Sequence, residues 1–214
     1  MFGRKKSNGQ DKRVRTSSMR IVCYSFIIAA FMLTFVFAQT WGNRVERIEA
    51  VSSSDVFKSF DLETLDGDHF TSDQLADAQI TLFNVWATDC GPCILEMPDL
   101  EELNNSYPEG QIQVIGLLAD SVNSDGSVIP AHIDEAKRIN GKCGVTYPSL
   151  IMSPELYAFR QTSVPGTPTT FYVNSKGEIV ETVVGRQEYS QMTAKVDETL
   201  AKMGESSATD GEGE

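Results

Sequence analysis

Basic residues are scarce in most of this chain. The 214 residues contain 18 Lys/Arg and 30 Asp/Glu, a net charge of −12. Seven of the basic residues lie within residues 1–20 beside a single acid, Asp11, so the rest of the chain carries 11 basic and 29 acidic side chains, a net charge of −18. Contacts to nucleic-acid phosphates require Lys and Arg. We therefore expect no nucleic-acid partner, and we expect the acidic surface to serve solubility.

Histidine is also scarce, since the chain has only His69 and His132. Protein sites for transition metals usually combine several cysteine, histidine and carboxylate ligands. Both histidines are isolated in the sequence, and we expect them at the surface or in a hairpin. The sequence therefore predicts neither a metal site nor a cofactor.

The basic N-terminus is followed by residues 21–38, a run of 18 residues without a charge. Such a run is just long enough to span a hydrocarbon core of ~30 Å, and the basic residues before it place the N-terminus in the cytoplasm. Two interpretations remain open. An uncleaved transmembrane anchor is favoured because the run exceeds the ~7–15 apolar residues of a signal-peptide core, whereas cleavage of a signal sequence after Ala38 would release a secreted protein. Either way, we expect the folded part outside the cytoplasm.

Two polar segments flank the expected domain. Residues 39–54 show no clear hydrophobic period, which indicates a linker next to the membrane. Residues 204–214 are small and acidic, without the apolar content that would order them. We therefore expect one domain over residues 55–203, which is long enough for a full hydrophobic core.

Two cysteines lie where an expected strand gives way to an expected helix. The segment WATDCGPC, residues 86–93, follows an apolar run and precedes a sequence with helical spacing. The first turn of a helix has unpaired N–H groups and the positive end of the macrodipole, which favour a thiolate. Cys90 would occupy the edge of that turn, and Cys93 lies one turn further along the same face, close enough to form a disulfide. The pair is therefore a dithiol that can be reversibly oxidised.

The other two cysteines have no such arrangement. Cys23 lies at the start of the apolar run 21–38, and Cys143 lies between two glycines, Gly141 and Gly144, with no local partner. In an oxidising compartment, thiols drift toward disulfides unless they are kept reduced. We expect Cys143 to be a partly buried free thiol, with a third redox cysteine as the alternative.

The remaining pattern alternates strands with helices. A β-hairpin is expected over residues 56–70 around the turn Asp66-Gly67. Further strands are expected at residues 80–87, 111–119, 147–152, 169–173 and 178–184, and helices at 74–78, 94–107, 130–139, 153–162 and 188–203. Strands alternating with helices, followed by a second hairpin and a closing helix, indicate an α/β fold with a mixed sheet.

The motif WATDCGPC, with Pro98 five residues after its second cysteine and the distant segment TPTTF at residues 167–171, resembles the thioredoxin superfamily. The likeness is closer to the extracytoplasmic TlpA/ResA-type branch, whose members carry a glutamate three residues after the second cysteine, here Glu96. The resemblance spans about residues 57–203. It implies a thioredoxin-like α/β fold, with a mixed central sheet flanked by helices and an N-terminal β-hairpin, here preceded by one transmembrane helix.

The resemblance also assigns catalytic roles. By motif position, Cys90 is the exposed nucleophile and Cys93 the buried resolving cysteine of a Cys90–Cys93 disulfide. Glu96 falls one turn below Cys93 on the face that packs toward the sheet, where burial favours a protonated carboxyl near neutrality and makes it a proton partner for Cys93. Plain thioredoxins carry a buried aspartate at the position that is Asn84 here, and Asn84 cannot titrate. An exposed helical glutamate is the alternative for Glu96.

Three residues around the cysteines are candidates for tuning the redox couple. Gly91 and Pro92 complete the CGPC sequence, which by resemblance favours a reductant. Asp89 departs from the family, in which an aromatic residue usually precedes the first cysteine. Its carboxylate would disfavour the Cys90 thiolate and make the couple more reducing, unless the side chain is swung into solvent.

Thr167 and Pro168 resemble the cis-proline loop of the family, which packs against the two cysteines and presents main-chain groups to an extended substrate. A cis bond is plausible only before proline. Pro165 is the rival position, but Pro168 directly precedes the expected strand, as the motif requires. Trp86 is a further candidate for contact with substrate, although packing in the core is the favoured interpretation.

Taken with the resemblance, these residues predict an extracytoplasmic thiol–disulfide oxidoreductase that reduces disulfides of partner proteins. Apocytochrome c thiols are one example of a client in this branch, and a membrane electron donor would restore the dithiol. A disulfide oxidase or isomerase of exported proteins could use the same residues. A copper-binding chaperone on this fold is disfavoured, since it would need a CxxxC spacing and a suitably placed histidine.

Overall fold

The structure, a computed structural model, describes residues 55–209, with side chains through Gly204. The expected basic segment 1–20, the apolar segment 21–38 and the linker 39–54 lie outside the described residues, as do residues 210–214 of the tail. Among the helices of residues 55–209, none has both the length and the apolar character needed to cross a bilayer.

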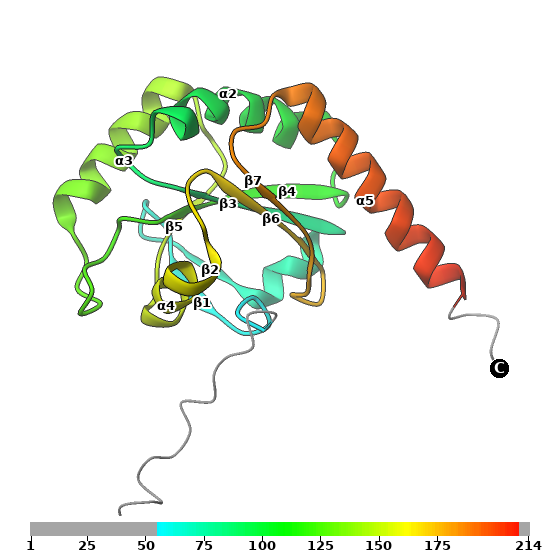
Figure 1. Cartoon of the computed structure of the whole chain (residues 1–214), viewed down its shortest axis with the longest axis horizontal. Helices are drawn as coiled ribbons and strands as arrows, with labels where there is room; N and C mark the ends of the chain where they lie inside the picture. Colours follow the sequence, from blue (N-terminus) through cyan, green and yellow to red (C-terminus); the bar gives the residue numbers. More distant parts are fainter. Residues whose placement is uncertain (1–54, 210–214) are drawn as a thin grey trace, which may run out of the picture. The chain divides into compact units, whose positions relative to one another are not determined.

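A five-stranded mixed sheet forms the centre of the described domain (Figure 1). Its strand order is β5-β4-β3-β6-β7. β3 (Ile80–Trp86), β4 (Ile112–Leu118) and β5 (Ser149–Ile151) are parallel, whereas β6 (Thr169–Asn174) pairs antiparallel with β3 and with β7 (Ile179–Val184). The predicted mixed sheet is confirmed. β5 is shorter than expected, and the proline at residue 148, which has no N–H to donate to a ladder, stands just before it.

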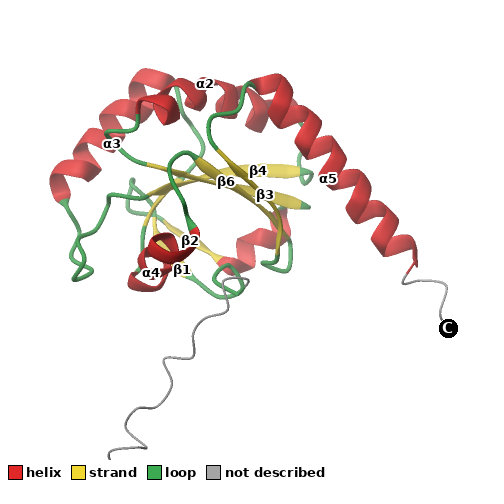
Figure 2. Ribbon diagram, viewed as in Figure 1, coloured by secondary structure: helices red, strands yellow, loops and turns green. Residues whose placement is uncertain are grey.

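Helices cover both faces of this sheet. α2 (Gly91–Ser106), α3 (Pro130–Cys143) and α5 (Tyr189–Thr209) lie on one face, and α4 (Pro154–Ser163) lies on the other (Figure 2). Short parallel crossovers place α2 and α3 on the same side, because right-handed connections between successive parallel strands leave them there. The β3–α2 crossover is the one that carries the cysteine motif.

The expected N-terminal hairpin is present as β1 (Asp61–Glu63) and β2 (His69–Thr71), and it leads into the 3₁₀ helix η1 (Ser72–Asp77). Gly67 has a φ of 90° in the connecting turn, a conformation that glycine adopts without steric cost. The N–H of Leu65 donates to the carbonyl of Ser149 (2.8 Å). The hairpin thereby covers the edge strand β5, which would otherwise present unpaired backbone groups.

Two helices, α3 and α5, continue past their predicted C-terminal ends. α3 continues past residue 139 to Cys143 and ends at Gly144, whose left-handed φ of 71° forms a C-cap. α5 continues past the expected end at residue 203 and reaches Thr209, so the first residues of the predicted disordered tail are helical. Once a helix is established, each further residue adds a hydrogen bond at little cost. The last helix is therefore longer than predicted.

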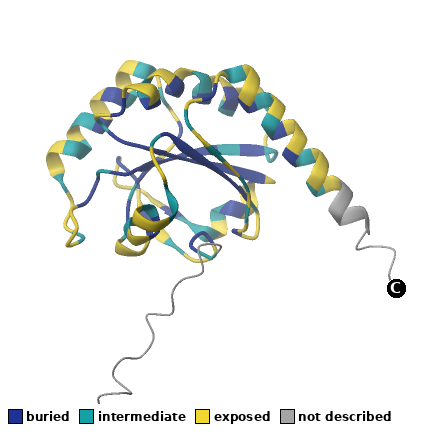
Figure 3. Ribbon diagram, viewed as in Figure 1, coloured by how far each residue is buried: buried dark blue, intermediate teal, exposed yellow. Residues whose placement is uncertain are grey.

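Two clusters of buried side chains form the core, and β3, β4 and β6 are buried along most of their length (Figure 3). β3 contributes to both clusters, and its successive side chains point to opposite faces of the sheet. On the α4 face, Phe83 stacks on Phe57 with ring centroids 4.4 Å apart. On the α2 and α5 face, Ile80 and Leu82 belong to a cluster with side chains of these two helices. Asn84 shares the parity of Ile80 and Leu82, so it faces α2.

Candidate active site

The cysteine motif lies at the carboxyl end of β3, where the chain turns into α2. Cys90 is the N-cap of α2 with extended backbone angles, and its N–H donates to the carbonyl of Ala87 (3.1 Å). Pro92 stands in the first turn of the helix, where its missing N–H costs nothing. Gly91 and Pro92 are both exposed, so the surface beside Cys90 is open to an incoming chain.

Cys90 and Cys93 form a disulfide with a Cα–Cα distance of 5.3 Å. Their surroundings differ, since Cys90 is 8% exposed and Cys93 is fully buried. The N–H of Cys93 donates to the Sγ of Cys90 (3.3 Å). An N–H of the first helical turn directed at this sulfur would stabilise a thiolate there once the disulfide is reduced.

Glu96 is fully buried one helical turn after Cys93. Burial raises the pKa of its carboxyl from 4.5 to about 7, because the charged form loses its hydration. Two hydrogen bonds act in the opposite direction. Glu96 Oε1 accepts the N–H of Gln187 (3.1 Å), and Oε2 accepts Asn84 Nδ2 at 3.5 Å. A carboxyl with a pKa near neutrality can both accept and release a proton under physiological conditions.

A buried polar network holds Glu96 in place. Asn84 Nδ2 also donates to Thr170 Oγ1 (3.0 Å), and Asn84 and Thr170 are paired in register between β3 and β6. The side chain of Gln187 accepts from the hydroxyl of Tyr172 at 3.4 Å. The Nε2 group of Gln187 is buried and has no hydrogen-bond partner among the described residues. Burial raises the pKa of Tyr172 to about 12, so this hydroxyl stays protonated.

An ion pair lies beside this network. The guanidinium of Arg186 is 3.6 Å from the carboxylate of Asp99, one turn beyond Glu96 on α2. Arg186 lowers the pKa of Glu96 and Asp99 raises it, both by weaker effects than burial. The proton affinity of Glu96 therefore depends mainly on its desolvation.

The bond between Thr167 and Pro168 is cis, as the resemblance implied. Pro168 is buried at the start of β6, and its carbonyl accepts the N–H of Gly185 (2.8 Å). Thr167 is partly exposed, and the preceding residue, Gly166, is exposed. β6 neighbours β3 in the sheet, so this loop and the cysteine motif belong to adjacent strands.

A family model described as Redoxin matches residues 52–200. The chain belongs to the Redoxin family. This match confirms the predicted relation to the thioredoxin superfamily and its ResA-type members. The thiol-disulfide oxidoreductase ResA of Bacillus thuringiensis (strain Al Hakam) is 32% identical over 117 residues, which are 51% of this chain and 57% of that protein. The chain thus spans little more than half the length of this relative.

A second relative and a solved structure extend the comparison. The thioredoxin-like protein YneN of Bacillus subtilis (strain 168) is 31% identical over 138 residues, which are 64% of this chain and 75% of YneN. The crystal structure of a thiol:disulfide interchange protein from Chlorobium tepidum TLS superposes with a TM-score of 0.56 at 24% identity, covering 67% of this chain and 94% of that one. This likeness shows that the fold is shared.

One group of residues beside the cysteine motif, Thr88, Asp120 and His132, was not identified from the sequence. The carboxylate of Asp120, just after β4, accepts both the N–H and the hydroxyl of Thr88, two residues before Cys90. His132 Nδ1 contacts the carbonyl of Asp120 at 2.7 Å and its carboxylate at 3.4 Å. The signal was present, because the carboxyl ends of adjacent parallel strands meet at one edge of the sheet. The His132 side chain is 40% exposed, in line with the expected surface position, but its contact with Asp120 was not predicted.

Four other residues singled out in the sequence have plainer surroundings. Trp86 is 1% exposed, so it lies in the core and does not reach the surface where a partner would bind. Cys143 is a free, partly buried thiol whose Sγ lies 3.8 Å from the carbonyl of Ile94. Asp89 is exposed next to Cys90. His69 is in the hairpin, where it pairs with Asp61 at 2.6 Å.

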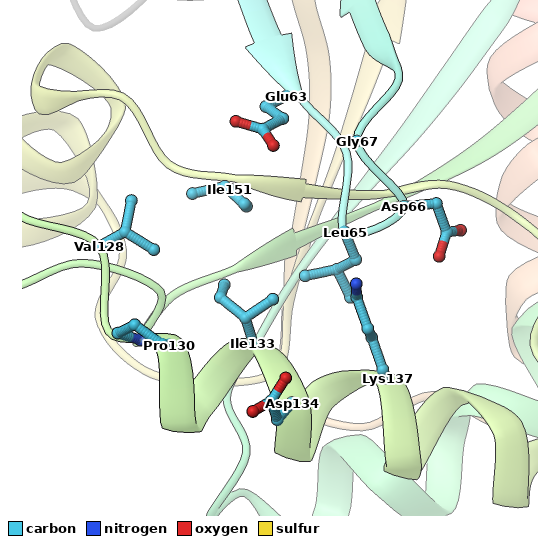
Figure 4. A pocket seen from close by; sticks show the side chains of 10 residues that line it. All are labelled: Glu63, Leu65, Asp66, Gly67, Val128, Pro130, Ile133, Asp134, Lys137 and Ile151. Carbon is cyan, nitrogen blue, oxygen red and sulfur yellow. The ribbon is translucent and has the colours of Figure 1, made fainter.

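A separate pocket lies between the hairpin turn, the loop before α3, α3 itself and β5 (Figure 4). Its volume is about 320 Å³, and its lining combines apolar side chains with Glu63, Asp134 and Lys137. Figure 4 shows Ile133 and Lys137 rising from α3 toward Leu65. Neither cysteine of the disulfide lines this pocket, so it is distinct from the dithiol.

Proposed function

We propose that this chain is a thiol–disulfide oxidoreductase of the extracytoplasmic side, which reduces disulfides in partner proteins. The observation that carries the proposal is the asymmetry of the cysteine pair: Cys90 is at the edge of the surface, and Cys93 is buried one turn before a glutamate with a pKa of about 7. Its Redoxin-family relatives support it, since one of them is named a thiol-disulfide oxidoreductase.

The first step uses the reduced dithiol. The Cys90 thiolate attacks one sulfur of the partner disulfide, so that a bond forms between Cys90 Sγ and that sulfur while the partner S–S bond breaks. The second partner sulfur leaves as a thiolate and takes up a proton. The N-cap position of Cys90 lowers the cost of forming the attacking thiolate.

The second step releases the partner. Cys93 transfers its proton to the Glu96 carboxylate and attacks Cys90 Sγ, which forms the Cys90–Cys93 disulfide and frees the first partner sulfur as a thiolate. Glu96 then releases its proton, which reaches the freed partner thiolate through solvent, so the net reaction converts one partner disulfide into two thiols and oxidises the dithiol of this chain. A dithiol electron donor in the membrane would reverse the oxidation.

The loop at Thr167 and Pro168 is the proposed docking place for the partner backbone. Thr167 is partly exposed and follows the exposed Gly166, whose carbonyl already accepts the hydroxyl of Thr169. An extended segment can bind the main chain at such an edge as an added strand. Recognition through the main chain would accept many sequences. Apocytochrome c is one client class that this arrangement could accept.

The location of the domain rests on the sequence outside the described residues. Residues 1–20 are basic and residues 21–38 are uncharged, which supports an N-terminus in the cytoplasm and a single membrane-spanning anchor. Cleavage after Ala38 would instead yield a secreted protein. Labelling the domain with a membrane-impermeant thiol reagent in intact cells would test its side of the membrane.

Trapping tests the activity. The Cys93→Ser variant cannot resolve a mixed disulfide, so we expect it to accumulate covalent adducts with partner proteins through Cys90. The Cys90→Ser variant is the matched control and should trap none. If Cys93→Ser forms no adducts and the intact protein reduces no protein disulfide, the proposed function is wrong. The reduction potential of the couple then separates a reductase from an oxidase.

A further inference from the structure

The turn that presents Cys90 is fastened by a side chain from the neighbouring strand. Thr88 N–H lies 3.1 and 3.3 Å from the two carboxylate oxygens of Asp120, and the Thr88 hydroxyl donates to the same carboxylate. Asp120 is the second residue after β4, and β4 pairs with β3 in parallel up to Trp86. One carboxylate therefore holds both hydrogen-bond donors of Thr88, which lies in the turn between β3 and Cys90.

Asp120 is itself held by α3. His132 Nδ1 must donate to the Asp120 carbonyl at 2.7 Å, because a carbonyl oxygen can only accept. The same nitrogen lies 3.4 Å from the carboxylate. The side chain of Asp120 is 21% exposed, so water screens its charge only in part. These contacts hold a negative charge at Thr88, two residues before Cys90.

We propose that Asp120 is a positioning residue of this dithiol, which fixes the turn before Cys90 and, through its charge, makes the couple more reducing. A carboxylate close to Cys90 disfavours the thiolate of the reduced protein, whereas the disulfide carries no charge and is unaffected. Destabilising the reduced form favours the transfer of electrons to a partner. This inference deepens the proposed function and depends on it.

The test must separate the effect of Asp120 on Cys90 from the effects of the other ionisable groups around the dithiol. Asp89 lies on the same turn and is exposed, Glu96 is buried on α2, and His132 faces Asp120 from α3. All three residues remain in the protein when Asp120 is changed to asparagine. The same loop provides a matched control, because Asp125 accepts the N–H and hydroxyl of Ser127 while it remains at the surface.

The experiment measures the redox equilibrium of the purified full chain with buffers that contain reduced and oxidised dithiothreitol in known ratio, across a range of pH. We expect Asp120→Asn to shift the equilibrium toward the reduced protein by about three- to tenfold, or about 15–30 mV for this two-electron couple. The shift should be present at about pH 9 and should shrink toward about pH 6, where Cys90 is protonated in both proteins. Asp125→Asn should match the wild type.

A purely structural role predicts a different result. Loss of packing or of a hydrogen bond would change the equilibrium by the same factor at every pH, so a pH-independent shift overturns the electrostatic part of the proposal. Equal behaviour of Asp120→Asn and Asp125→Asn overturns it entirely. If Asp120→Asn fails to fold, Asp120→Ser keeps a hydroxyl for the Thr88 N–H without the charge and should give the same direction. A wild-type protein that does not equilibrate with dithiothreitol would instead refute the proposed function.

Discussion

The two cysteines of one four-residue motif have contrasting surroundings. Cys90 lies at the edge of the surface, with exposed neighbours on both sides and an N–H donor from the first turn of α2. Cys93 is fully buried one turn before Glu96, whose carboxyl is held by a polar network and has a pKa of about 7. The surroundings of Cys90, which we call the outer side, suit a thiolate that reacts with other proteins. The surroundings of Cys93 and Glu96, which we call the inner side, suit the transfer of one proton.

The largest expected effect comes from removing the proton acceptor of the inner side. We expect Glu96→Gln to slow the release of a trapped partner by about a hundredfold, the typical contribution of a general base. In the wild type, this rate should fall as the pH drops below about 7, because the carboxyl of Glu96 becomes protonated and can no longer accept from Cys93. Stopped-flow measurement of mixed-disulfide resolution against pH gives both results.

A control on the same helix separates the loss of the proton acceptor from the loss of one negative charge. Glu102 is an exposed residue of α2, and Glu102→Gln removes the same charge without touching the network. Its rate and pH profile should equal those of the wild type. A pH profile of Glu96→Gln that keeps the inflection near 7 would remove Glu96 from the mechanism.

The same substitution should stabilise the fold at alkaline pH. The pKa of Glu96 is raised on folding, so the folded state holds a proton between about pH 4.5 and 7 that the unfolded chain has lost, and stability falls as the pH rises through this window. Glutamine carries no such penalty. We expect Glu96→Gln to be more stable than the wild type by at most about 3 kcal/mol above pH 7 and equally stable below about pH 4.5.

Chemical denaturation of the oxidised protein at several pH values measures this difference. The wild type and Glu102→Gln serve as references, since Glu102 is exposed on the same helix. If the stability difference does not change with pH, folding does not raise the pKa of Glu96, and the prediction is wrong.

A smaller effect is expected from the ion pair beside the network. Arg186 lowers the pKa of Glu96, so Arg186→Gln should raise it and move the midpoint of the resolution profile to higher pH. The shift should be modest, because the Arg186 side chain is 38% exposed and its field is screened. Arg138→Gln, which breaks an exposed ion pair with Glu135 on α3, is the control and should leave the midpoint in place. A downward shift in Arg186→Gln would contradict the assignment.

The smallest effect is expected on the outer side, at Asp89. This carboxylate is exposed next to Cys90, so salt and water screen most of its influence on the thiolate. We expect Asp89→Asn to make the couple slightly less reducing, by less than about threefold in the equilibrium with dithiothreitol and by less than Asp120→Asn. A larger shift of the redox equilibrium in Asp89→Asn than in Asp120→Asn would contradict the proposal that Asp120 influences the couple more than Asp89 does.

Local sequence patterns predicted most of the fold and the centre of the site. The uninterrupted apolar run of β3, the helical spacing after the cysteines and the Asp66-Gly67 turn each depend on neighbouring residues, so they could be identified without a structure. Glu96 could be identified because its position on the helix relative to Cys93 fixes which face it occupies. The resemblance implied a cis proline, and the strand that follows distinguished Pro168 from Pro165.

The missed features depend on contacts between segments that are distant in sequence. Asp120 and Thr88 are 32 residues apart, and their contact requires knowing that β3 and β4 are parallel neighbours. The support of Glu96 by Gln187 spans 91 residues and involves a backbone N–H, which no side-chain pattern reveals. The extension of α5 was missed for a different reason, because composition alone does not show where an established helix ends.

Site-resolved alkylation of the reduced protein tests the contrast between the two cysteines most directly. Mass spectrometry after short exposure to iodoacetamide gives a separate rate for each thiol at each pH. We predict that Cys90 reacts much faster than Cys93 at neutral pH, and that Glu96→Gln changes the pH dependence of the Cys93 rate but leaves the Cys90 rate unchanged. Equal rates at both cysteines, or a Cys93 profile that ignores Glu96, would contradict it.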